Sequence, residues 1–316
     1  MTDRDHERMT QPRYAGIPTF FRTRMSEGLD DVDIGLIGVP YDGAVTNRTG
    51  TRHGPREVRN QSSLIRVFHQ ITKISPYELA RIADLGDVPI ARPYALDEAM
   101  AAIGAFYRDV VGRGIVPVST GGDHAIALAI LRAVGKDRPV GMVHIDAHAD
   151  TGDEYLGSRY HHGTPFRRAV EEGVLDPKRT CQIGIRGTVN DRELWKFSAD
   201  SGMRLIDMEE VEDLGIPAVI AEARRVAGDG PVYVSFDIDS LDPVYAPGTG
   251  TPEAGGFTMR EALRLVRGLR GLDVVGADMV EVSPPFDVGG LTAFHGATVL
   301  FELLCLAAEA FAARRA

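Results

Sequence analysis

Acidic and imidazole side chains alternate in one short run, HIDAHAD, of this 316-residue sequence. One residue separates Asp146 from His148 and His148 from Asp150, and Asp237 and Asp239 repeat this spacing in VYVSFDID. Because extended chain sends alternate side chains to the same side, we expect each group to converge at the end of a strand. Clustered polar groups of this kind have no good role in packing, so the pattern favours a functional site.

Another candidate ligand, His124, stands in GGDHAIAL where a glycine turn opens into a helical pattern. The potential ligands are then His124, Asp146, His148, Asp150, Asp237 and Asp239. Four carboxylates and two imidazoles form an oxygen-dominated set, which suits Mn²⁺ better than a zinc site made of Cys and His. Their negative charges exceed what one divalent ion balances. We therefore expect two metals, about 3.5 to 4 Å apart, that supply a hydrolytic nucleophile at neutral pH.

Further polar residues follow other predicted strands. His161 and His162 precede a Gly-Thr-Pro turn after the HIDAHAD run, where one of them could shuttle protons near neutral pH. Glu281, in MVEVSPP, stands where it could recognise a cationic group, although a helix cap or an ion pair would explain it too. Asp123 and Asp242, taken singly, fit helix N-caps as well as they fit a site.

The composition is that of an ordinary globular protein, with 44% hydrophobic and 25% charged residues, and the chain need not form two domains. A formal net charge of -10 argues against a nucleic-acid surface, because phosphate binding requires clustered Lys and Arg. Small cationic or zwitterionic substrates remain compatible. Cys181 and Cys305 lie in apolar stretches without a metal knuckle or disulfide framework, which favours a reducing, cytoplasmic setting.

Neither end of the sequence predicts a membrane segment. The polar residues 1–12 are expected to form a flexible tail and lack the apolar run of a signal peptide, about 7 to 15 residues long. The apolar stretch Ala297 to Ala313 is interrupted by Glu302 and Glu309 and falls short of the roughly 20 apolar residues that a membrane span requires. It predicts a buried terminal helix, and no membrane partner is expected.

Short β-branched and apolar runs alternate with helical patterns along the chain. The expected strands are Asp33–Val39, Ile115–Thr120, Val140–Asp146, Cys181–Ile185, Val232–Asp237 and Val274–Val280, and the expected helices include Leu96–Val111 and His124–Val134. This alternation predicts a parallel sheet covered by helices on both faces. In such sheets ligands bind beyond the carboxyl ends of the strands, where each polar cluster is placed. The Gly- and Pro-rich stretch Ala246–Gly256 is expected to be a loop that lines the site.

The chain resembles the ureohydrolase family of arginase, agmatinase and the guanidino-acid hydrolases. The resemblance rests on GGDHAIAL, HIDAHAD, HHGTPF, SFDIDSLDPVYAPGTGTPE and EVSPPFD, which occur in family order. It runs from about Arg13 to the C-terminus and implies one catalytic domain, residues 13–316. The runs VPYDGAVTNRTGTRHGPREVRN and VSPPFDVGG are similar to the bacterial guanidinopropionase, guanidinobutyrase and proclavaminate amidinohydrolase branch. A three-layer α/β/α sandwich of the arginase-like kind, a binuclear Mn²⁺ centre and a closed homo-oligomer, a trimer or hexamer, are implied.

The resemblance also implies hydrolysis of a guanidino group to urea and an amine, with the six ligands that the spacing had already selected. His162 corresponds to the family's proton-shuttling histidine, although the adjacent His161 leaves the choice between them open. Glu281 corresponds to the carboxylate that holds the substrate guanidinium. Asp150 would accept a hydrogen bond from the nucleophile and hold it in line.

The segment after Asp150 bears on the choice of guanidine. Arginase-like sequences carry an Asn there that helps to recognise an α-amino acid, whereas this chain has TGDEY, so arginine is disfavoured. The bulky Tyr155 is expected to shorten the pocket and favour 3-guanidinopropionate, and Arg159 could pair with its carboxylate or be a solvated surface residue. Agmatine, 4-guanidinobutyrate or another guanidine, with Ni²⁺ in place of Mn²⁺, are the alternatives. A histone-deacetylase-like or catalytically silent protein is disfavoured, because ligands for two metals are all present.

Overall fold

Eight parallel strands form one sheet in the computed structural model, which describes residues 11–26 and 28–316. The strands are β1 (Ile34–Val39), β2 (Ile82–Asp87), β3 (Val116–Gly121), β4 (Val140–Ile145), β5 (Leu175–Ile185), β6 (Arg204–Asp207), β7 (Pro231–Asp237) and β8 (Asp273–Val280). Their order across the sheet is β2-β1-β3-β8-β7-β4-β5-β6. β1, β3 and β4 are buried along their whole length, as expected of strands covered on both faces.

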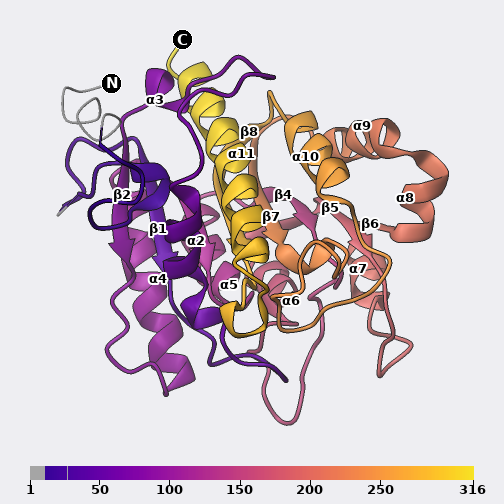
Figure 1. The fold of residues 1–316 in the computed structure, drawn as a ribbon. Coiled ribbons are helices and arrows are strands. Elements are labelled where there is room, and N and C mark those ends of the chain that lie inside the picture. The colour runs from indigo at the N-terminus through magenta and orange to yellow at the C-terminus, as the bar shows by residue number, and fades with distance from the viewer. Residues whose placement is uncertain (1–10, 27) are drawn as a thin grey trace.

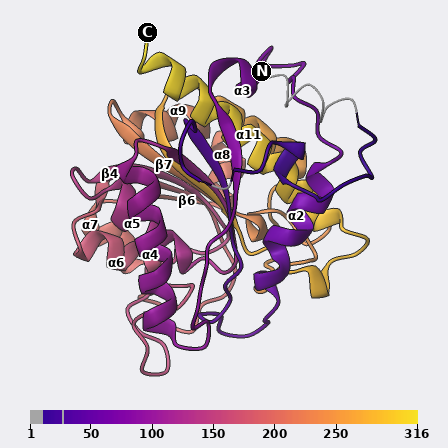
Figure 2. The same cartoon turned by 90° about the vertical axis from the view of Figure 1, so that its left-hand side faces the viewer.

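Helices cover both faces of the sheet (Figure 1). One layer holds α4 (Leu96–Gly112), α5 (Ile126–Val134), α6 (Pro165–Glu171) and α7 (Lys196–Ser201). The other holds α2 (Gly54–Ser62), α3 (Pro76–Leu79), α8 (Met208–Leu214), α9 (Ile216–Ala227), α10 (Met259–Gly268) and α11 (Leu291–Ala313). Figure 2 shows α4, α5 and α6 on one side of the sheet and α2 and α11 on the other. Short 3-10 turns lie at Phe20–Arg22, Thr51–His53, Ile238–Ser240 and Pro284–Phe286.

Two apolar cores lie on opposite faces of the sheet. Side chains of α4, α5 and α6 pack on one face, where Tyr107 and Phe166 are fully buried. Side chains of α2, α9, α10 and α11 pack on the other face, where Phe236 and Phe257 are fully buried. The expected three-layer α/β/α sandwich with a parallel sheet is therefore confirmed.

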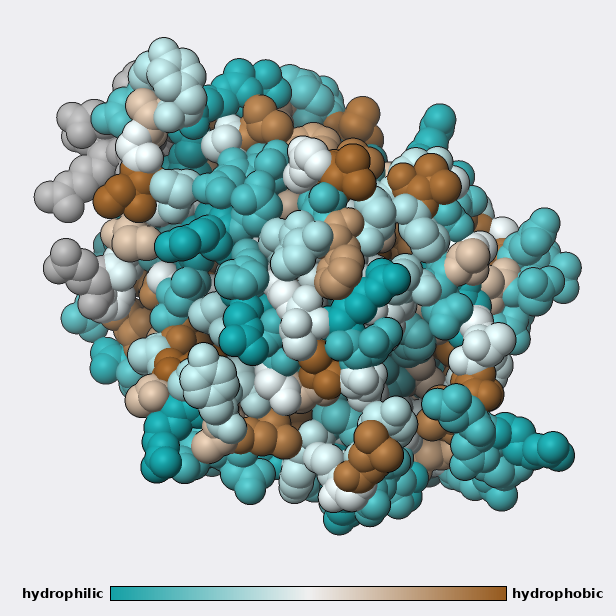
Figure 3. Space-filling model, turned by 60° about the horizontal axis from the view of Figure 1, so that its bottom comes forward, coloured by the Kyte–Doolittle hydropathy of each residue, from teal (hydrophilic) through white to brown (hydrophobic). Residues whose placement is uncertain are grey.

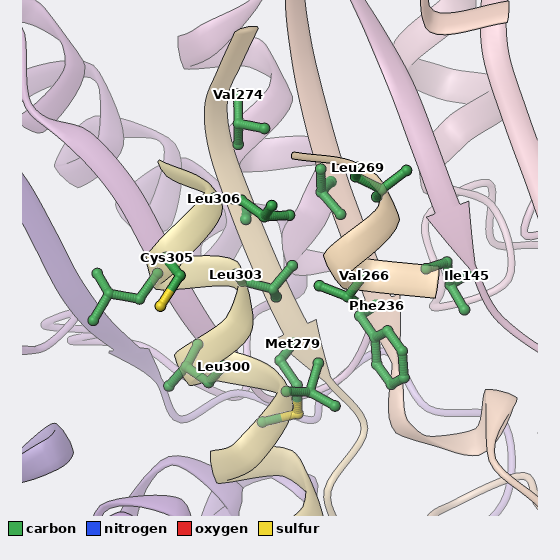
Figure 4. Packing of buried hydrophobic residues seen from close by; sticks show 14 of the residues in the cluster. Ile145, Phe236, Val266, Leu269, Val274, Met279, Leu300, Leu303, Cys305 and Leu306 are labelled. Atoms are coloured by element: carbon green, nitrogen blue, oxygen red, sulfur yellow. The ribbon is translucent and has the colours of Figure 1, made fainter. Parts of the chain in front are cut away.

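The helix α11 is longer than the apolar stretch that predicted it. It begins at Leu291, after Gly290 has turned the chain with a φ of 75°. Over its 23 residues it is long and apolar enough to cross a membrane, so the argument from length was wrong. The helix is nevertheless 72% buried over its most apolar window, and Leu303 and Leu306 pack toward the sheet (Figure 4). The prediction of a buried terminal helix is confirmed.

Two strands, β2 and β6, were not predicted, and they form the two edges of the sheet. Their sequences, IADLGD and RLID, are short and carry charged residues, so neither has the apolar run that marks a central strand. The six predicted strands are all present, although β5 begins earlier than expected, at Leu175. Residues 1–10 of the predicted N-terminal tail lie outside the described residues.

Candidate metal centre

The loops that follow β1, β4 and β7 lie at one end of the molecule, toward the bottom of Figure 1, beyond the carboxyl ends of the strands. Figure 3 shows this end of the molecule, on which hydrophilic side chains dominate and hydrophobic ones are scattered. A cleft of about 730 Å³ is formed by the loops after β1, β4 and β7 together with the segment that follows β5. The sequence-predicted residues that line it are His148, Asp150, Tyr155, His161, His162, Asp237 and Asp239. The Gly- and Pro-rich stretch contributes Thr251, as expected of a loop that lines the site.

The candidate ligands converge through turns rather than along extended chain. β4 ends at Ile145, and Asp150 adopts a left-handed backbone with a φ of 51°. β7 ends at Asp237, whose Oδ1 accepts the Asp239 N–H at 2.8 Å as the chain enters the 3-10 turn Ile238–Ser240. The sequence analysis expected the ligands to converge because side chains alternate along extended chain. That reason was wrong, because both strands end before the last ligands. The side chains converge all the same.

Gly122 helps to place His124 just beyond β3. A Cβ on Gly122 would lie 2.0 Å from the Tyr41 carbonyl oxygen, so only glycine lets the two segments pass this closely. The Gly122 carbonyl accepts the Glu281 N–H at 3.0 Å, and the His124 N–H donates to Glu281 Oε1 at 2.9 Å. The loops after β3 and β8 are thereby joined, and the histidine is held next to the glutamate.

Three carboxylates surround one nitrogen of His124. Its Nδ1 lies 3.0 Å from Asp150 Oδ2 and 3.1 Å from the Oδ2 atoms of Asp146 and Asp237. This buried nitrogen nevertheless has no hydrogen-bond partner. Buried polar atoms in proteins are almost always bonded, so an orphaned nitrogen ringed by carboxylate oxygens calls for a ligand between them. The donor set fits a divalent cation.

A second group of donors shares Asp146. His148 Nδ1 lies 3.1 Å from Asp239 Oδ2 and 3.6 Å from Asp146 Oδ1. Potential ligand atoms of these three residues all lie within 4.8 Å of one another. Asp146 thus faces His124 with one oxygen and His148 with the other, an arrangement that fits two neighbouring cations joined by a carboxylate.

His144 lies beside the cluster, but both of its ring nitrogens are already used. The Gln182 amide nitrogen donates to His144 Nδ1 at 3.1 Å and to the Ala149 carbonyl at 2.6 Å, while its oxygen accepts the Ser198 hydroxyl. Since Nδ1 is an acceptor, the ring proton is on Nε2 and is donated to Asp146 Oδ2 at 2.7 Å. His144 therefore orients a carboxylate ligand, which supports its exclusion from the predicted ligand set.

Burial and mutual repulsion dominate the electrostatics of the cluster. Burial, together with the charges of Asp239 and Asp146, raises the pKa of Asp237 well above its ordinary value. Burial disfavours a charged His124, but the surrounding carboxylates outweigh this effect and raise its pKa well above the usual range. Protons therefore bind these atoms tightly when no cation is present. Cations and protons compete for the same positions.

Glu281 and His162, both predicted site residues, form a buried pair beside the cluster. Glu281 Oε1 lies 3.0 Å from His162 Nδ1, whereas the buried Oε2 has no hydrogen-bond partner. On the other side of the ring, His162 Nε2 lies 2.8 Å from Thr46 Oγ1. Burial disfavours a charged imidazole, but the hydrogen bond with Glu281 and nearby carboxylates outweigh it and raise the pKa of His162 to about 9. These surroundings therefore favour the protonated form of His162.

Tyr155 and His161 form a neighbouring part of the cleft wall. Tyr155 and Ser158 exchange two backbone hydrogen bonds across a tight turn, and the Tyr155 ring lies tilted beside the His161 ring at a centroid distance of 5.8 Å. Burial, and then the charge of His162, lower the pKa of His161. Of the two adjacent histidines, His162 is the one that contacts Glu281 and whose pKa is raised.

The remaining acidic candidates hold loops together. Asp123 accepts the N–H groups of Ala44 and Ala125, and Asp242 accepts those of Val244, Gly255 and Gly256. Asp123 thus supports the start of α5 and Asp242 supports the Gly-rich loop. Neither is among the residues that line the cleft.

Two arginines of the cleft were not predicted. Arg167 lines the cleft and pairs with Asp153, whereas Arg159, which pairs with the same carboxylate, is exposed and does not line it. Arg186 donates to the backbone carbonyl of Asp239 at 2.8 Å and to further carbonyls in residues 240–254. It thereby fixes the loop that presents a candidate ligand. The sequence does mark it, since Arg186 is a charged residue directly after the apolar end of β5.

Comparisons with known proteins identify relatives over nearly the whole chain. The Arginase family model matches residues 32–305. Guanidinopropionase of Pseudomonas aeruginosa is 60% identical over 302 residues, 95% of both chains, and guanidinobutyrase of the same species is 46% identical over 299 residues, 93% of both. The solved structure of proclavaminate amidinohydrolase from Streptomyces clavuligerus matches with a TM-score of 0.91 and 38% identity, covering 95% of this chain and 100% of that one. The resemblance seen in the motifs is confirmed, and the chain belongs to the arginase family.

Proposed function

We propose that this chain is a guanidine hydrolase that cleaves 3-guanidinopropionate to β-alanine and urea with two bound Mn²⁺ ions. The proposal rests on the buried Glu281 carboxylate, which stands beside the ligand cluster with one oxygen lacking any partner. A guanidinium is planar and presents parallel N–H donors, so a buried carboxylate is a well-matched partner for it. The 60% identity to a guanidinopropionase supports the choice of acid.

The residues that would hold the cations fall into two sets with a shared member, His124, Asp146, Asp150 and Asp237 for one and Asp146, His148 and Asp239 for the other. Two divalent cations bound there would lower the pKa of water enough to supply hydroxide near neutral pH. Asp146 and Asp239 are fully buried or nearly so, which keeps bulk water away and strengthens the electrostatic interactions inside the site.

His162 is proposed to protonate the departing amine. An amide-like anion is a poor leaving group, so the nitrogen that leaves must receive a proton as its bond to carbon breaks. His162 has a pKa of about 9 and sits against the same Glu281 carboxylate that would hold the guanidinium. The proton therefore passes from the imidazolium to the amine, and urea and β-alanine are the products.

The cleft wall favours a short guanidino acid. Tyr155 lines the cleft and lies tilted beside the His161 ring, so its own ring takes up space that a longer substrate would need. Arg167 brings a positive charge to the same cleft, although its pairing with Asp153 partly neutralises that charge. A compact substrate with a carboxylate end fits both features.

Urea release across a panel of guanidines tests the proposed function. The Mn²⁺-loaded protein is assayed with 3-guanidinopropionate, 4-guanidinobutyrate, agmatine, arginine and the proclavaminate precursor, and we expect the highest kcat/KM with 3-guanidinopropionate. A preference for agmatine or 4-guanidinobutyrate would replace the substrate assignment. Urea from none of them would overturn the hydrolase assignment. A parallel series with Ni²⁺ decides between the two metals.

Replacing Tyr155 with Met is expected to shift preference toward the longer acid. The flexible, narrower side chain leaves room for one more methylene group, and a methylene in an apolar pocket changes kcat/KM by about 10- to 200-fold. We expect the ratio of kcat/KM for 4-guanidinobutyrate to that for 3-guanidinopropionate to rise about tenfold. Leu156→Ala, at the exposed tip of the same turn, is the control. An unchanged ratio in Tyr155→Met would remove Tyr155 from substrate selection.

We further propose a cytoplasmic closed homo-oligomer, a trimer or hexamer, as the resemblance implies. Large apolar side chains are exposed at Ile17, Ile71 and Val288, and they are available for contacts between subunits. Sedimentation velocity of the purified protein measures the assembly directly.

A further inference from the structure

A polar chain of side chains lies behind the candidate ligands and takes no part in the reaction proposed above. Ser235 on β7 and Asp278 on β8 face each other across the sheet, and both are fully buried. His124 Nε2 lies 2.8 Å from Ser235 Oγ. Tyr233, also fully buried, reaches the same Asp278. These side chains connect the interior of the sheet to the ring of a candidate metal ligand.

The direction of each hydrogen bond in this chain follows from the groups themselves. Asp278 accepts the Tyr233 hydroxyl at Oδ2 (2.5 Å) and the Ser235 hydroxyl at Oδ1 (2.6 Å). A serine hydroxyl has a single proton, so Ser235 Oγ, having donated to Asp278, can only accept from His124. Nε2 of His124 therefore carries a ring proton, and Nδ1, which the three carboxylates surround, is the nitrogen that a cation can bind when it displaces the other proton.

We propose that Ser235 and Asp278 are positioning residues that select the metal-binding tautomer of His124. Without an acceptor at Nε2, the carboxylates around Nδ1 would draw the proton to that nitrogen and block its lone pair. The Ser235 oxygen holds the proton on the opposite side of the ring, and Asp278 keeps that oxygen turned toward the histidine. The inference rests on the proposed metal centre but not on the identity of the substrate.

The neighbouring strand offers a matched control. Ser119 on β3 is as fully buried as Ser235, and it shares its hydroxyl with a buried tyrosine, Tyr107, at 2.7 Å. Ser119 is hydrogen-bonded to that tyrosine and not to a candidate ligand. Loss of the Ser119 hydroxyl removes one buried hydrogen bond, and loss of the Ser235 hydroxyl removes two, one of them to a candidate ligand. Ser119→Ala therefore controls for the loss of a buried serine hydroxyl in a central strand. Only the Ser235 hydroxyl is connected to metal binding.

Binding of Mn²⁺ to metal-stripped protein, followed by the electron paramagnetic resonance signal of the free ion, tests the inference without substrate. Ser235→Ala is expected to raise the dissociation constant of one of the two ions by about 10- to 100-fold, as loss of an outer partner of a metal-bound histidine does. Ser119→Ala should leave both dissociation constants unchanged. Ser235→Cys keeps the volume but accepts hydrogen bonds only weakly, and it should act like Ser235→Ala. This second variant serves where the alanine variant does not fold.

The outcomes separate the inference from the metal centre on which it rests. Unchanged dissociation constants in both Ser235 variants overturn the role of Ser235, and so does an equal loss in Ser119→Ala. A wild-type protein that binds no Mn²⁺ overturns the proposed metal centre itself. Two ions in the wild type, with weakened binding confined to the Ser235 variants, support the inference whichever guanidine is hydrolysed.

Discussion

Asp237→Asn is expected to reduce kcat/KM for urea release by at least about a thousandfold, because metal catalysis contributes several kcal/mol to transition-state stabilisation. The Asp237 carboxylate lies 3.1 Å from His124 Nδ1, in the first set of candidate ligands, and it also accepts the N–H of Asp239, a candidate ligand of the second set. Asparagine preserves the shape and removes the charge that a cation needs. Steady-state urea assays and metal counts on the same sample measure the effect, and full activity with two bound ions would exclude Asp237 as a ligand.

The stability of the metal-free protein separates this effect from misfolding. Because the pKa of Asp237 is raised in the folded state, folding at neutral pH requires the carboxyl to keep a proton that the unfolded chain releases. This cost grows as the pH rises above the ordinary value of 3.8 and vanishes below it. Metal-free Asp237→Asn should therefore unfold at a higher temperature than metal-free wild type at pH 7, and at a similar temperature near pH 3. Calorimetry at the two pH values checks the sign.

Glu281→Gln is expected to lower kcat/KM by about 30- to 5,000-fold while both metals stay bound, since breaking a buried charge pair costs about 2–5 kcal/mol. Glutamine retains an oxygen that can accept the His124 N–H but carries no charge to hold a guanidinium. The hydrogen bond that raises the pKa of His162 is weakened too, so the alkaline limb of the pH–rate profile should move to lower pH. Wild-type kcat/KM in this variant would place the guanidinium elsewhere.

The candidate ligands could be predicted because they occur in short segments of sequence, each of which directly follows an apolar strand. The reason for their convergence could not be predicted, because the left-handed backbone of Asp150 and the 3-10 turn at Asp239 produce no periodic pattern in the sequence. Ser235 and Asp278 are polar residues inside buried strands, which is a visible anomaly. The hydrogen bond between them could not be predicted, because it depends on β7 and β8 being neighbours, which only the strand order of the sheet shows.

Substrate choice was the part least accessible to sequence. Arg159 was either a partner of a substrate carboxylate or a solvated surface residue in the sequence analysis, and the structure places it outside the cleft that Arg167 lines. The two residues are in different segments, and both pair with Asp153, so charge and spacing do not distinguish them. Which cation faces the cleft depends on how α6 packs against the loop that carries Tyr155.

Selection for a stable folded protein and selection for catalytic activity favour different residues at positions 150 and 281, which are Asp150 and Glu281 in this chain. Both residues have a left-handed backbone, with φ of 51° and 65°. Glycine adopts this conformation freely, whereas other residues adopt it at a conformational cost of about 1–3 kcal/mol. A lineage that keeps the fold but no longer needs the reaction has no reason to retain either carboxylate. Glycine or asparagine at these positions in a related sequence therefore indicates a protein that has kept the fold and lost the hydrolytic activity.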